Sequence, residues 1–377
     1  MATFKIFMVG GRRCGKTTIL SKIKTHFNSV LQHTTDDAIQ YNLLKLLPPV
    51  EDITKLNRAQ DCINEMFRDI DCYTEFPIDE NSTPGITTTT FKLNPLRGSG
   101  SISLEFTDVP GEWFSSVDEG NENHQREIVE LIAASDVVLM AIDTPSLMEE
   151  NGRFADYYNR INDIKDLFST AFNGEIFTSN QKQKMILFVP LKCEKYIVNA
   201  NGSVNIEKQK ELCTVVEQRY ADMIRNFRDY PNNLTMAIVP IITIKEVEWA
   251  RFYAVGGDTD SIYNDNGDFK SFRYGAAEML CSKFRFKPDL YYEVKEGLGE
   301  SQSLYCEQPL IYSLAFLLKY YSMQKGANIL WRIPILGDII KLLSDNPAFE
   351  QEMERLRAKR MKKGNDGFRI LQNPLGI

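Results

Sequence analysis

An apolar run that stops at a cluster of glycines opens the sequence, as "FKIFMVGGRRCGKTTIL" over residues 4–20. The segment from Gly10 to Thr17 satisfies the pattern G-x-x-x-x-G-K-[ST], and it lies between a strand-like run and a helical pattern. Glycines let such a turn aim successive backbone N–H groups at a phosphate, and the following helix adds the positive end of its dipole. The segment predicts a phosphate-binding turn; the alternative is a glycine-rich turn that binds nothing.

The side chains of this turn have separate expected tasks. Lys16, also a catalytic candidate, is expected to reach the β- and γ-phosphates, and Thr17 is expected to give its hydroxyl to Mg²⁺. Arg12 and Arg13 are either phosphate contacts or solvated charges of the loop. The candidates for phosphate contact are Gly10, Gly11, Arg12, Arg13, Cys14, Gly15, Lys16, Thr17 and Thr18.

Short apolar runs recur along the chain and indicate buried parallel strands. They cover residues 4–10, 101–108, 136–143, 184–191 and 234–242. Stretches with helical spacing, such as 121–134 and 205–228, lie between them. This alternation predicts an α/β fold with a doubly wound, mostly parallel sheet, which binds ligands at the carboxyl ends of its strands.

Two segments depart from the alternation. Residues 31–80 contain two stretches that have the spacing of amphipathic helices, 36–47 and 52–70, and they predict an inserted helical segment. Residues 326–377 are read as a C-terminal helical appendage with a charged stretch and a polar end. The predicted nucleotide-binding domain therefore spans residues 1–325.

Composition limits the classes of function. With 377 residues, 43% of them hydrophobic, the chain can bury a large core, and its net charge of −7 argues against a surface made for nucleic acid. Its seven cysteines form no C-x-x-C pair, so neither a disulfide framework nor a zinc site is indicated. We find no signal-peptide pattern, and Arg332 and Asp338 interrupt the most apolar late segment. A cytoplasmic protein without a transmembrane segment is expected.

A magnesium-bound triphosphate needs a carboxylate behind the metal. In "LEFTDVPGE", Asp108 ends a predicted strand, and Gly111 follows three residues later, where its amide can sense the γ-phosphate. Asp143, at the end of "VVLMAID", is the second candidate, although it lacks the following D-x-x-G pattern; its alternative reading is a turn-forming acid at a strand end. Asp108 is ranked first.

A threonine run in "STPGITTTTFKL" precedes this strand. The hydroxyl of Thr87 or Thr88 is placed to complete the coordination of Mg²⁺ from a movable loop. Because threonine favours strands in any case, the run is also explained by strand structure alone.

Together, the phosphate-binding turn, the threonine loop and the D-x-P-G-E segment, in this order, resemble the Ras-like GTPases of the translation-factor class. More closely, the chain is similar to a bacterial branch of predicted GTPases of the TRAFAC clade, described as double-GTPase type. The resemblance covers roughly residues 3–320. It is carried by the segments "FKIFMVGGRRCGKTTIL", "FTDVPGEWF", "VPLKCEKY", "VPIITIKEVEWARF" and "YCEQPLIYSLAFLL".

The resemblance implies binding of GTP or GDP with Mg²⁺, and two switch loops, at about 82–91 and 109–127, that an unidentified protein partner reads. These GTPases recognise guanine with N-K-x-D. Here "LKCE" supplies Lys192 and Glu194, whereas Leu191 replaces the asparagine, which weakens selectivity over ATP. A surface charge pair is the alternative reading of Lys192 and Glu194. Thr243 matches the position where the family supplies a backbone N–H to the base.

The residue after D-x-x-G is Glu112, where Ras-like enzymes carry the glutamine that orients the attacking water. As a catalytic candidate, its carboxylate can position water but adds negative charge beside an anionic phosphate, so slow turnover is expected. An arginine, whether Arg12, Arg13, Arg126 or one from a partner, would offset this charge. His124 is either an assisting group or an ordinary surface histidine.

Three functions compete. The first is a GTPase switch, a slow Mg²⁺-dependent hydrolase whose loops change with the bound nucleotide. The second is a scaffold that holds GTP or GDP without turning it over, suggested by Leu191 and Glu112. The third is an ATPase that uses Asp143 as its metal-holding acid.

Overall fold

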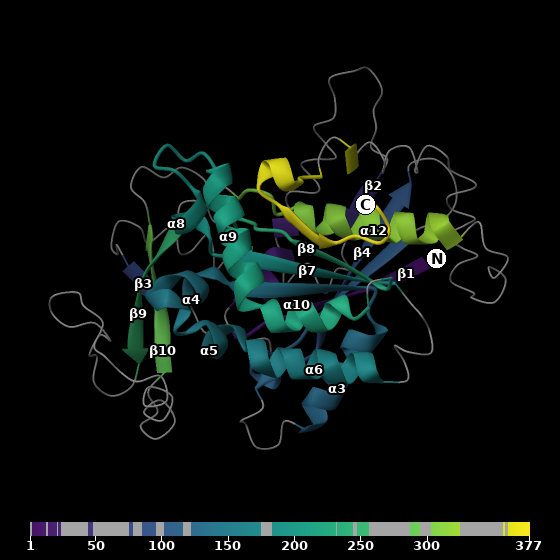
Figure 1. Cartoon of the computed structure of the whole chain (residues 1–377), viewed down its shortest axis with the longest axis horizontal. Helices are drawn as coiled ribbons and strands as arrows, with labels where there is room; N and C mark the ends of the chain where they lie inside the picture. The colour runs from purple at the N-terminus through teal and green to yellow at the C-terminus, as the bar shows by residue number, and fades with distance from the viewer. Residues whose placement is uncertain are drawn as a thin grey trace.

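A mixed sheet forms the centre of the computed structural model (Figure 1). The structure describes residues 2–12, 14–20, 22–23, 44–47, 75–77, 85–95, 102–115, 122–174, 183–230, 232–243, 247–255, 287–294, 303–324, 357–358 and 361–377. Within these residues, eight strands pair in the order β11-β8-β7-β6-β1-β5-β4-β2. The bounds are β1 (Ala2–Val9), β2 (Leu44–Leu47), β4 (Thr87–Pro95), β5 (Ile102–Asp108), β6 (Val137–Asp143), β7 (Lys184–Leu191), β8 (Leu234–Ile238) and β11 (Arg369–Gln372).

The five central strands, β8, β7, β6, β1 and β5, run parallel, and antiparallel strands extend both edges. These five are the strands that the apolar runs predict. Val137 to Ile142 of β6 are all buried because helices cover both faces of the sheet. The predicted α/β fold with a doubly wound, mostly parallel sheet is confirmed.

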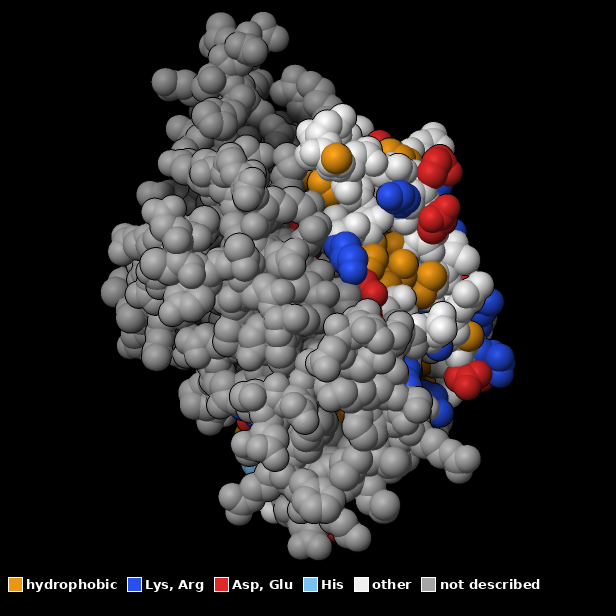
Figure 2. Space-filling model, turned by 90° about the vertical axis from the view of Figure 1, so that its left-hand side faces the viewer, with side chains coloured by type: hydrophobic (Ala, Val, Ile, Leu, Met, Phe, Trp, Pro, Cys, Tyr) orange, Lys and Arg blue, Asp and Glu red, His pale blue; other side chains and the backbone are white. Residues whose placement is uncertain are grey.

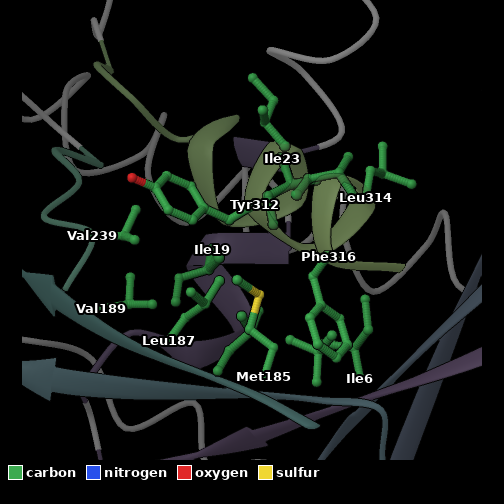
Figure 3. Close-up of a cluster of buried hydrophobic side chains, with 14 of the residues drawn as sticks. Ile6, Ile19, Ile23, Met185, Leu187, Val189, Val239, Tyr312, Leu314 and Phe316 are labelled. Atoms are coloured by element: carbon green, nitrogen blue, oxygen red, sulfur yellow. The ribbon is translucent and has the colours of Figure 1, made fainter. Parts of the chain in front are cut away.

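Two layers of buried side chains hold the helices on the sheet. On one face pack the first helix, with helical residues 16–20 and 22–23, and α12 (Gln308–Gln324). In the part of the chain that the structure describes, the longer helices on the other face are α3 (Glu122–Ala134), α6 (Ile161–Asn173), α9 (Ile206–Arg219) and α10 (Ala221–Arg228). In Figure 1, α12 lies on the opposite side of the sheet from α3 and α6. Figure 3 shows Tyr312 and Phe316 of α12 in one buried layer with Ile6 and Met185.

Short helices follow the carboxyl ends of two central strands. After β6 come α4 (Thr144–Met148), the 3-10 helix η2 (Glu149–Gly152) and α5 (Ala155–Asn159), and after β7 comes α8 (Glu194–Ile197). In Figure 1, α4, α5 and α8 lie in the left half of the molecule. They therefore gather where an α/β sheet binds its ligand.

A second, three-stranded sheet was not predicted. It pairs β3 (Glu75–Pro77), β10 (Lys287–Val294) and β9 (Val247–Val255) in antiparallel fashion. On the face that includes this end of the molecule, the described surface carries hydrophobic side chains among charges of both signs (Figure 2).

The predicted helical insertion differs from the structure in its described part. Leu44–Leu47, expected at the end of a helix over 36–47, is strand β2, antiparallel to β4. A short leucine-rich run satisfies a buried strand as well as a helix, and pairing with β4 decides between them. The rest of 36–47, and all of 52–70, lie outside the described residues.

The end of the chain also differs from the expected helical appendage. Residues 369–372 form β11, which pairs antiparallel with β8, after the 3-10 helix η4 (Gly364–Asp366). Phe368 and Ile377 are buried in the same layer as α12, and this apolar anchoring explains why the end joins the sheet. Residues 326–356 lie outside the described part of the chain, and the domain boundary near residue 325 stays a prediction.

Candidate nucleotide-binding site

The glycine-rich turn between β1 and the first helix has the backbone that its sequence predicts. Gly15 has φ +99° and Gly10 has φ +154°, values that residues with a Cβ rarely adopt. A Cβ atom at Gly10 would also lie 2.7 Å from the carbonyl oxygen of Ala141 in β6. The turn is therefore seated tightly against the central strands.

Lys16 is folded back over the turn. Its Nζ donates to the carbonyl oxygens of Gly10 at 2.9 Å and Gly11 at 3.2 Å, and the residue is only 6% exposed. The same Gly11 oxygen accepts from Cys14 Sγ at 3.0 Å. Burial raises the pKa of the Cys14 thiol, although Lys16 and Lys192 act to lower it. The ammonium of Lys16 thus points into the loop, within reach of a phosphate seated there.

The two expected metal ligands meet. Thr17 Oγ1 donates to Asp108 Oδ2 at 3.0 Å, and Asp108 is 2% exposed at the carboxyl end of β5. The contact follows from the pairing of β5 with β1, which aligns Asp108 with Met8, just before the turn. A hydroxyl and a carboxylate are hard oxygen ligands of the kind that Mg²⁺ takes.

The threonine run lies in a strand from its first residue. Thr87 begins β4 and pairs with Asp108 of β5, so a threonine stands beside the carboxylate. The next residue, Thr88, is exposed. The expectation of a movable loop at Thr87 and Thr88 differs from this arrangement, because the β-branched residues continue the antiparallel ladder.

Gly111 brings the segment after β5 against the turn. A Cβ atom at Gly111 would lie 2.3 Å from the backbone nitrogen of Arg12, so only glycine fits there. Gly111 begins the 3-10 helix η1 (Gly111–Phe114), in which the catalytic candidate Glu112 is exposed. Trp113 stacks on His124 with ring centroids 3.8 Å apart, which favours a packing role for this histidine.

The prediction also names Arg126, Thr18 and Arg13. Arg126 is an exposed residue of α3, and Thr18 is half-buried in the first helix. Arg13 lies outside the described residues.

The candidate base-binding residues lie in two adjacent loops after β7 and β8. Ile241 N donates to Pro190 O at 3.1 Å, and Cys193 Sγ donates to Ile241 O at 3.2 Å. Thr243 follows this contact and is 7% exposed, and Glu194, at the start of α8, is 4% exposed. These hydrogen bonds join the two loops at the carboxyl end of the sheet.

Leu191 is the last residue of β7, and Lys192 follows it. Leu191 is buried, and its Cδ1 would be 3.4 Å from a Cβ atom at Gly15, so its side chain packs toward the phosphate-binding turn. Lys192 has φ +55°, and its Nζ lies 2.8 Å from Asp143 Oδ1. Leu191 therefore fills the space beside the turn with hydrocarbon, where the N-K-x-D pattern has an amide.

Asp143 has structural contacts that the sequence did not reveal. It is the N-cap of α4, where its Oδ2 accepts from Ser146 N at 3.2 Å, and its backbone N–H donates to Asn159 Oδ1 at 2.7 Å. These contacts agree with the reading of Asp143 as a turn-forming acid. Asn159 lies 16 residues along the chain and carries no motif signal, so sequence reasoning missed it.

A glycine-rich turn between a strand and a helix, a buried lysine over it, and a threonine–aspartate pair beside it are the features of an α/β fold with a P-loop. No family model and no curated protein matches the chain. None of the helices in the described residues has both the length and the apolar character to cross a membrane.

Among solved structures, the chain is similar to the GTPase-like domain of S. cerevisiae Ski7. The structure of that domain bound to GDP and inorganic phosphate is 13% identical, with a TM-score of 0.36, over 64% of this chain and 43% of that chain. The structure bound to GTP is 14% identical, with a TM-score of 0.36 and the same coverage. The match thus spans less than half of the Ski7 chain. The fold assignment rests on strand order and on the turn itself.

Proposed function

We propose that the protein binds GTP and GDP with Mg²⁺ and hydrolyses GTP slowly, as a molecular switch. The observation that carries the proposal is the 3.0 Å contact of Thr17 with Asp108, directly beside the turn that Lys16 covers. Hydrophobic packing does not account for the buried carboxylate of Asp108, because burying a charge is costly unless the charge is paired or holds a metal.

The residues present fit Mg²⁺. Thr17 and Asp108 would hold it, with Thr87 or Thr88 as a further hydroxyl, and phosphate oxygens would complete the coordination. Bound Mg²⁺ would neutralise charge on the β- and γ-phosphates. Lys16 would exchange the carbonyl oxygens of Gly10 and Gly11 for the phosphates, a change in partners that needs little movement of the loop.

Hydrolysis would be slow because of Glu112. Its carboxylate would orient the attacking water beside Gly111, whose amide would contact the γ-phosphate, but it would also repel the phosphate. Arg12, whose backbone lies against Gly111, would be one source of compensating positive charge. Arg13, Arg126 or an arginine of a partner are the other sources of positive charge.

Switching would follow from the contact of the Gly111 amide with the γ-phosphate. Loss of the γ-phosphate would release Gly111 from the turn, and the loop at about 109–127 would rearrange. Of the second predicted switch loop, at about 82–91, residues 87–91 belong to β4 and would stay paired with β5. An unidentified protein partner would read both loops. We propose membership of the bacterial TRAFAC-clade GTPases on the sequence resemblance alone, and a cytoplasmic location on the scattered cysteines of the sequence.

Base recognition would use Lys192, Glu194 and the backbone at Thr243, which lie in the adjacent loops after β7 and β8. Glu194 would accept hydrogen bonds from guanine. The buried Leu191 leaves the N-K-x-D pattern incomplete, so selectivity over ATP is expected to be modest.

Measurements of nucleotide binding and phosphate release also test two alternative functions. A non-hydrolysing scaffold is favoured by the exposed Glu112 and by Leu191, and bound nucleotide without phosphate release over hours would support it. An ATPase that uses Asp143 as metal ligand has less support, because the two carboxylate oxygens of Asp143 contact Lys192 and Ser146. Direct competition between ATP and GTP separates this alternative from the others.

The test begins with the nucleotide released when the purified protein is denatured. Fluorescent GDP and GTP are then titrated with Mg²⁺, and phosphate release is followed over time. We expect Lys16→Ala to weaken GTP binding about a hundredfold, since a charge-assisted contact to phosphate is worth roughly 3 kcal/mol. Lys195→Met is the matched control: Lys195, on α8, pairs its ammonium with Glu149 of η2, and its loss should leave binding as in the unsubstituted protein. The proposal is rejected if the unsubstituted protein, Lys16→Ala and Lys195→Met bind GTP equally well, or if none of them binds it.

A further inference from the structure

We propose that Asp143 is a positioning residue for the nucleotide base: it fixes the ammonium of Lys192 and so ties the base-binding loop to the phosphate-binding turn. This inference rests on the proposed nucleotide binding and adds to it. It also gives Asp143 a role in the same site that is different from holding a metal.

The ion pair is short and shielded. Lys192 Nζ lies 2.8 Å from Asp143 Oδ1, with side-chain exposures of 12% and 2%. Removing one member of such a pair leaves the other charge buried, which is more costly than losing an exposed pair. Lys192 also has φ +55°, an unusual backbone conformation for a residue with a long side chain. Both features indicate that the surroundings hold Lys192 in one arrangement.

Asp143 is itself fixed by its neighbours. Its Oδ2 accepts from Ser146 N at 3.2 Å, and its carbonyl oxygen accepts from Ser146 Oγ at 2.8 Å and from Asn159 Nδ2 at 3.3 Å. Asn159 also accepts from the Asp143 backbone N–H at 2.7 Å and donates to Ser146 Oγ at 2.8 Å. All three residues are no more than 1% exposed, so the carboxylate cannot turn away from Lys192 without breaking a closed network.

The same network reaches the phosphate-binding turn. Tyr158, next to Asn159 in α5, presses its carbonyl oxygen against Gly11, where a Cβ atom would lie only 1.9 Å from that oxygen. The carbonyl of Gly11 in turn holds Lys16 and Cys14. One short helix therefore supports the turn through its backbone and the base-binding lysine through Asn159 and Asp143.

The function of this arrangement follows from the chemistry of the lysine. A lysine that lies along a base has a flexible four-carbon stem, and fixing its ammonium restricts the stem before the ligand arrives. A neutral amide in place of the carboxylate has only one acceptor oxygen, so it can accept from Ser146 N but then turns its NH₂ group, a donor, toward the ammonium of Lys192. The pair is therefore expected to affect ligands that contain a base and to leave bare polyphosphate binding unchanged.

The experiment compares GDP with inorganic tripolyphosphate, both with Mg²⁺, by calorimetric titration of the full chain. Asp143→Asn keeps an acceptor for Ser146 N and removes the charge. We expect it to weaken GDP binding about tenfold, within the range typical of coupling between two sites, and to change tripolyphosphate binding less than about twofold. Lys192→Met should have the same effect, and the double variant should lose no more than either single variant.

Glu149→Gln is the matched control, because it removes the charge of another carboxylate that pairs with a lysine, Lys195, at 2.8 Å. It should leave both affinities unchanged. If Asp143→Asn fails to fold, Asp143→Glu keeps the charge but displaces it, and a selective loss of GDP binding is again expected. Three results would overturn the role of Asp143: equal losses for GDP and tripolyphosphate, additive effects of the two single variants, or unchanged GDP binding. The proposed nucleotide binding would stand in each case. If the unsubstituted protein binds neither ligand, the proposed function fails, and this inference fails with it.

Discussion

The phosphate side and the base side of the candidate site are built differently. On the phosphate side, Lys16, Thr17 and Asp108 stand where the motif predicts, held by backbone geometry and by the pairing of β1 with β5. On the base side, the loop after β7 keeps Lys192 but has a buried leucine and a carboxylate partner, Asp143. The first side follows a general rule for binding phosphate, whereas the second depends on packing specific to this chain.

The difference has a physical origin. A phosphate is recognised by N–H groups, a lysine and a metal, and these leave little freedom in residue type or spacing. A base is recognised by its edge and its faces, and several combinations of side chains can provide this. Substitutions on the phosphate side should therefore weaken the binding of all nucleotides alike. Substitutions on the base side should change the selectivity between nucleotides or the stability of the hydrophobic core.

The largest effect is expected from Leu191→Asn, which restores the asparagine of the N-K-x-D pattern. Leu191 is 1% exposed and belongs to the buried layer shared with Val189 and Ile241. We expect the free energy of unfolding to fall by about 4 kcal/mol, because a core leucine is lost and a polar amide is buried. Chemical denaturation measures this loss.

Leu191→Met is the control, since a volume-conserving apolar exchange should cost less than about 1.5 kcal/mol. Tighter GDP binding by Leu191→Asn without loss of stability would remove the contrast between the two sides, because the base side would then accept the usual pattern.

The phosphate side was predictable because its pattern is local. Eight consecutive residues determine the turn, and the apolar runs around it locate β1, β5 and β6. The base side was predictable only in its loops. The contact of Asp143 with Asn159 joins residues 16 positions apart through a short helix, and no spacing in the sequence announces it.

The edges of the sheet were also missed, for a related reason. Strands β2 and β11 have four residues each, too few to show a period, and partner strands decide their structure. Within "FRILQ", Phe368 reaches the buried layer only because β8 offers an open edge to Arg369–Gln372. Tertiary pairing of this kind is not contained in local pattern.

A smaller effect is expected at the contact between the two sides. Gly11→Ala would place a Cβ atom 1.9 Å from the carbonyl oxygen of Tyr158, so α5 must shift. We expect a loss of about 3 kcal/mol in the free energy of unfolding, at the upper end of the cost of overpacking. GDP and tripolyphosphate binding should weaken together, because the turn itself is displaced. Gly364→Ala, at a position where a Cβ atom would meet open space, is the control and should change neither quantity. Unchanged stability in Gly11→Ala would show that α5 does not brace the turn.

The smallest effect is expected at Glu112, where the phosphate side departs from the Ras-like pattern. Glu112→Gln removes a negative charge beside the γ-phosphate, and two unit charges about 4 Å apart in water interact by about 1 kcal/mol. Phosphate release in a single turnover should therefore be about fivefold faster, with GDP affinity unchanged. Glu122→Gln, in the first turn of α3, removes an equal charge from an exposed position and should leave the rate as it is. A slower reaction in Glu112→Gln would mean that the carboxylate acts on the attacking water more than it repels the phosphate, and the phosphate side would then be as specific to this chain as the base side.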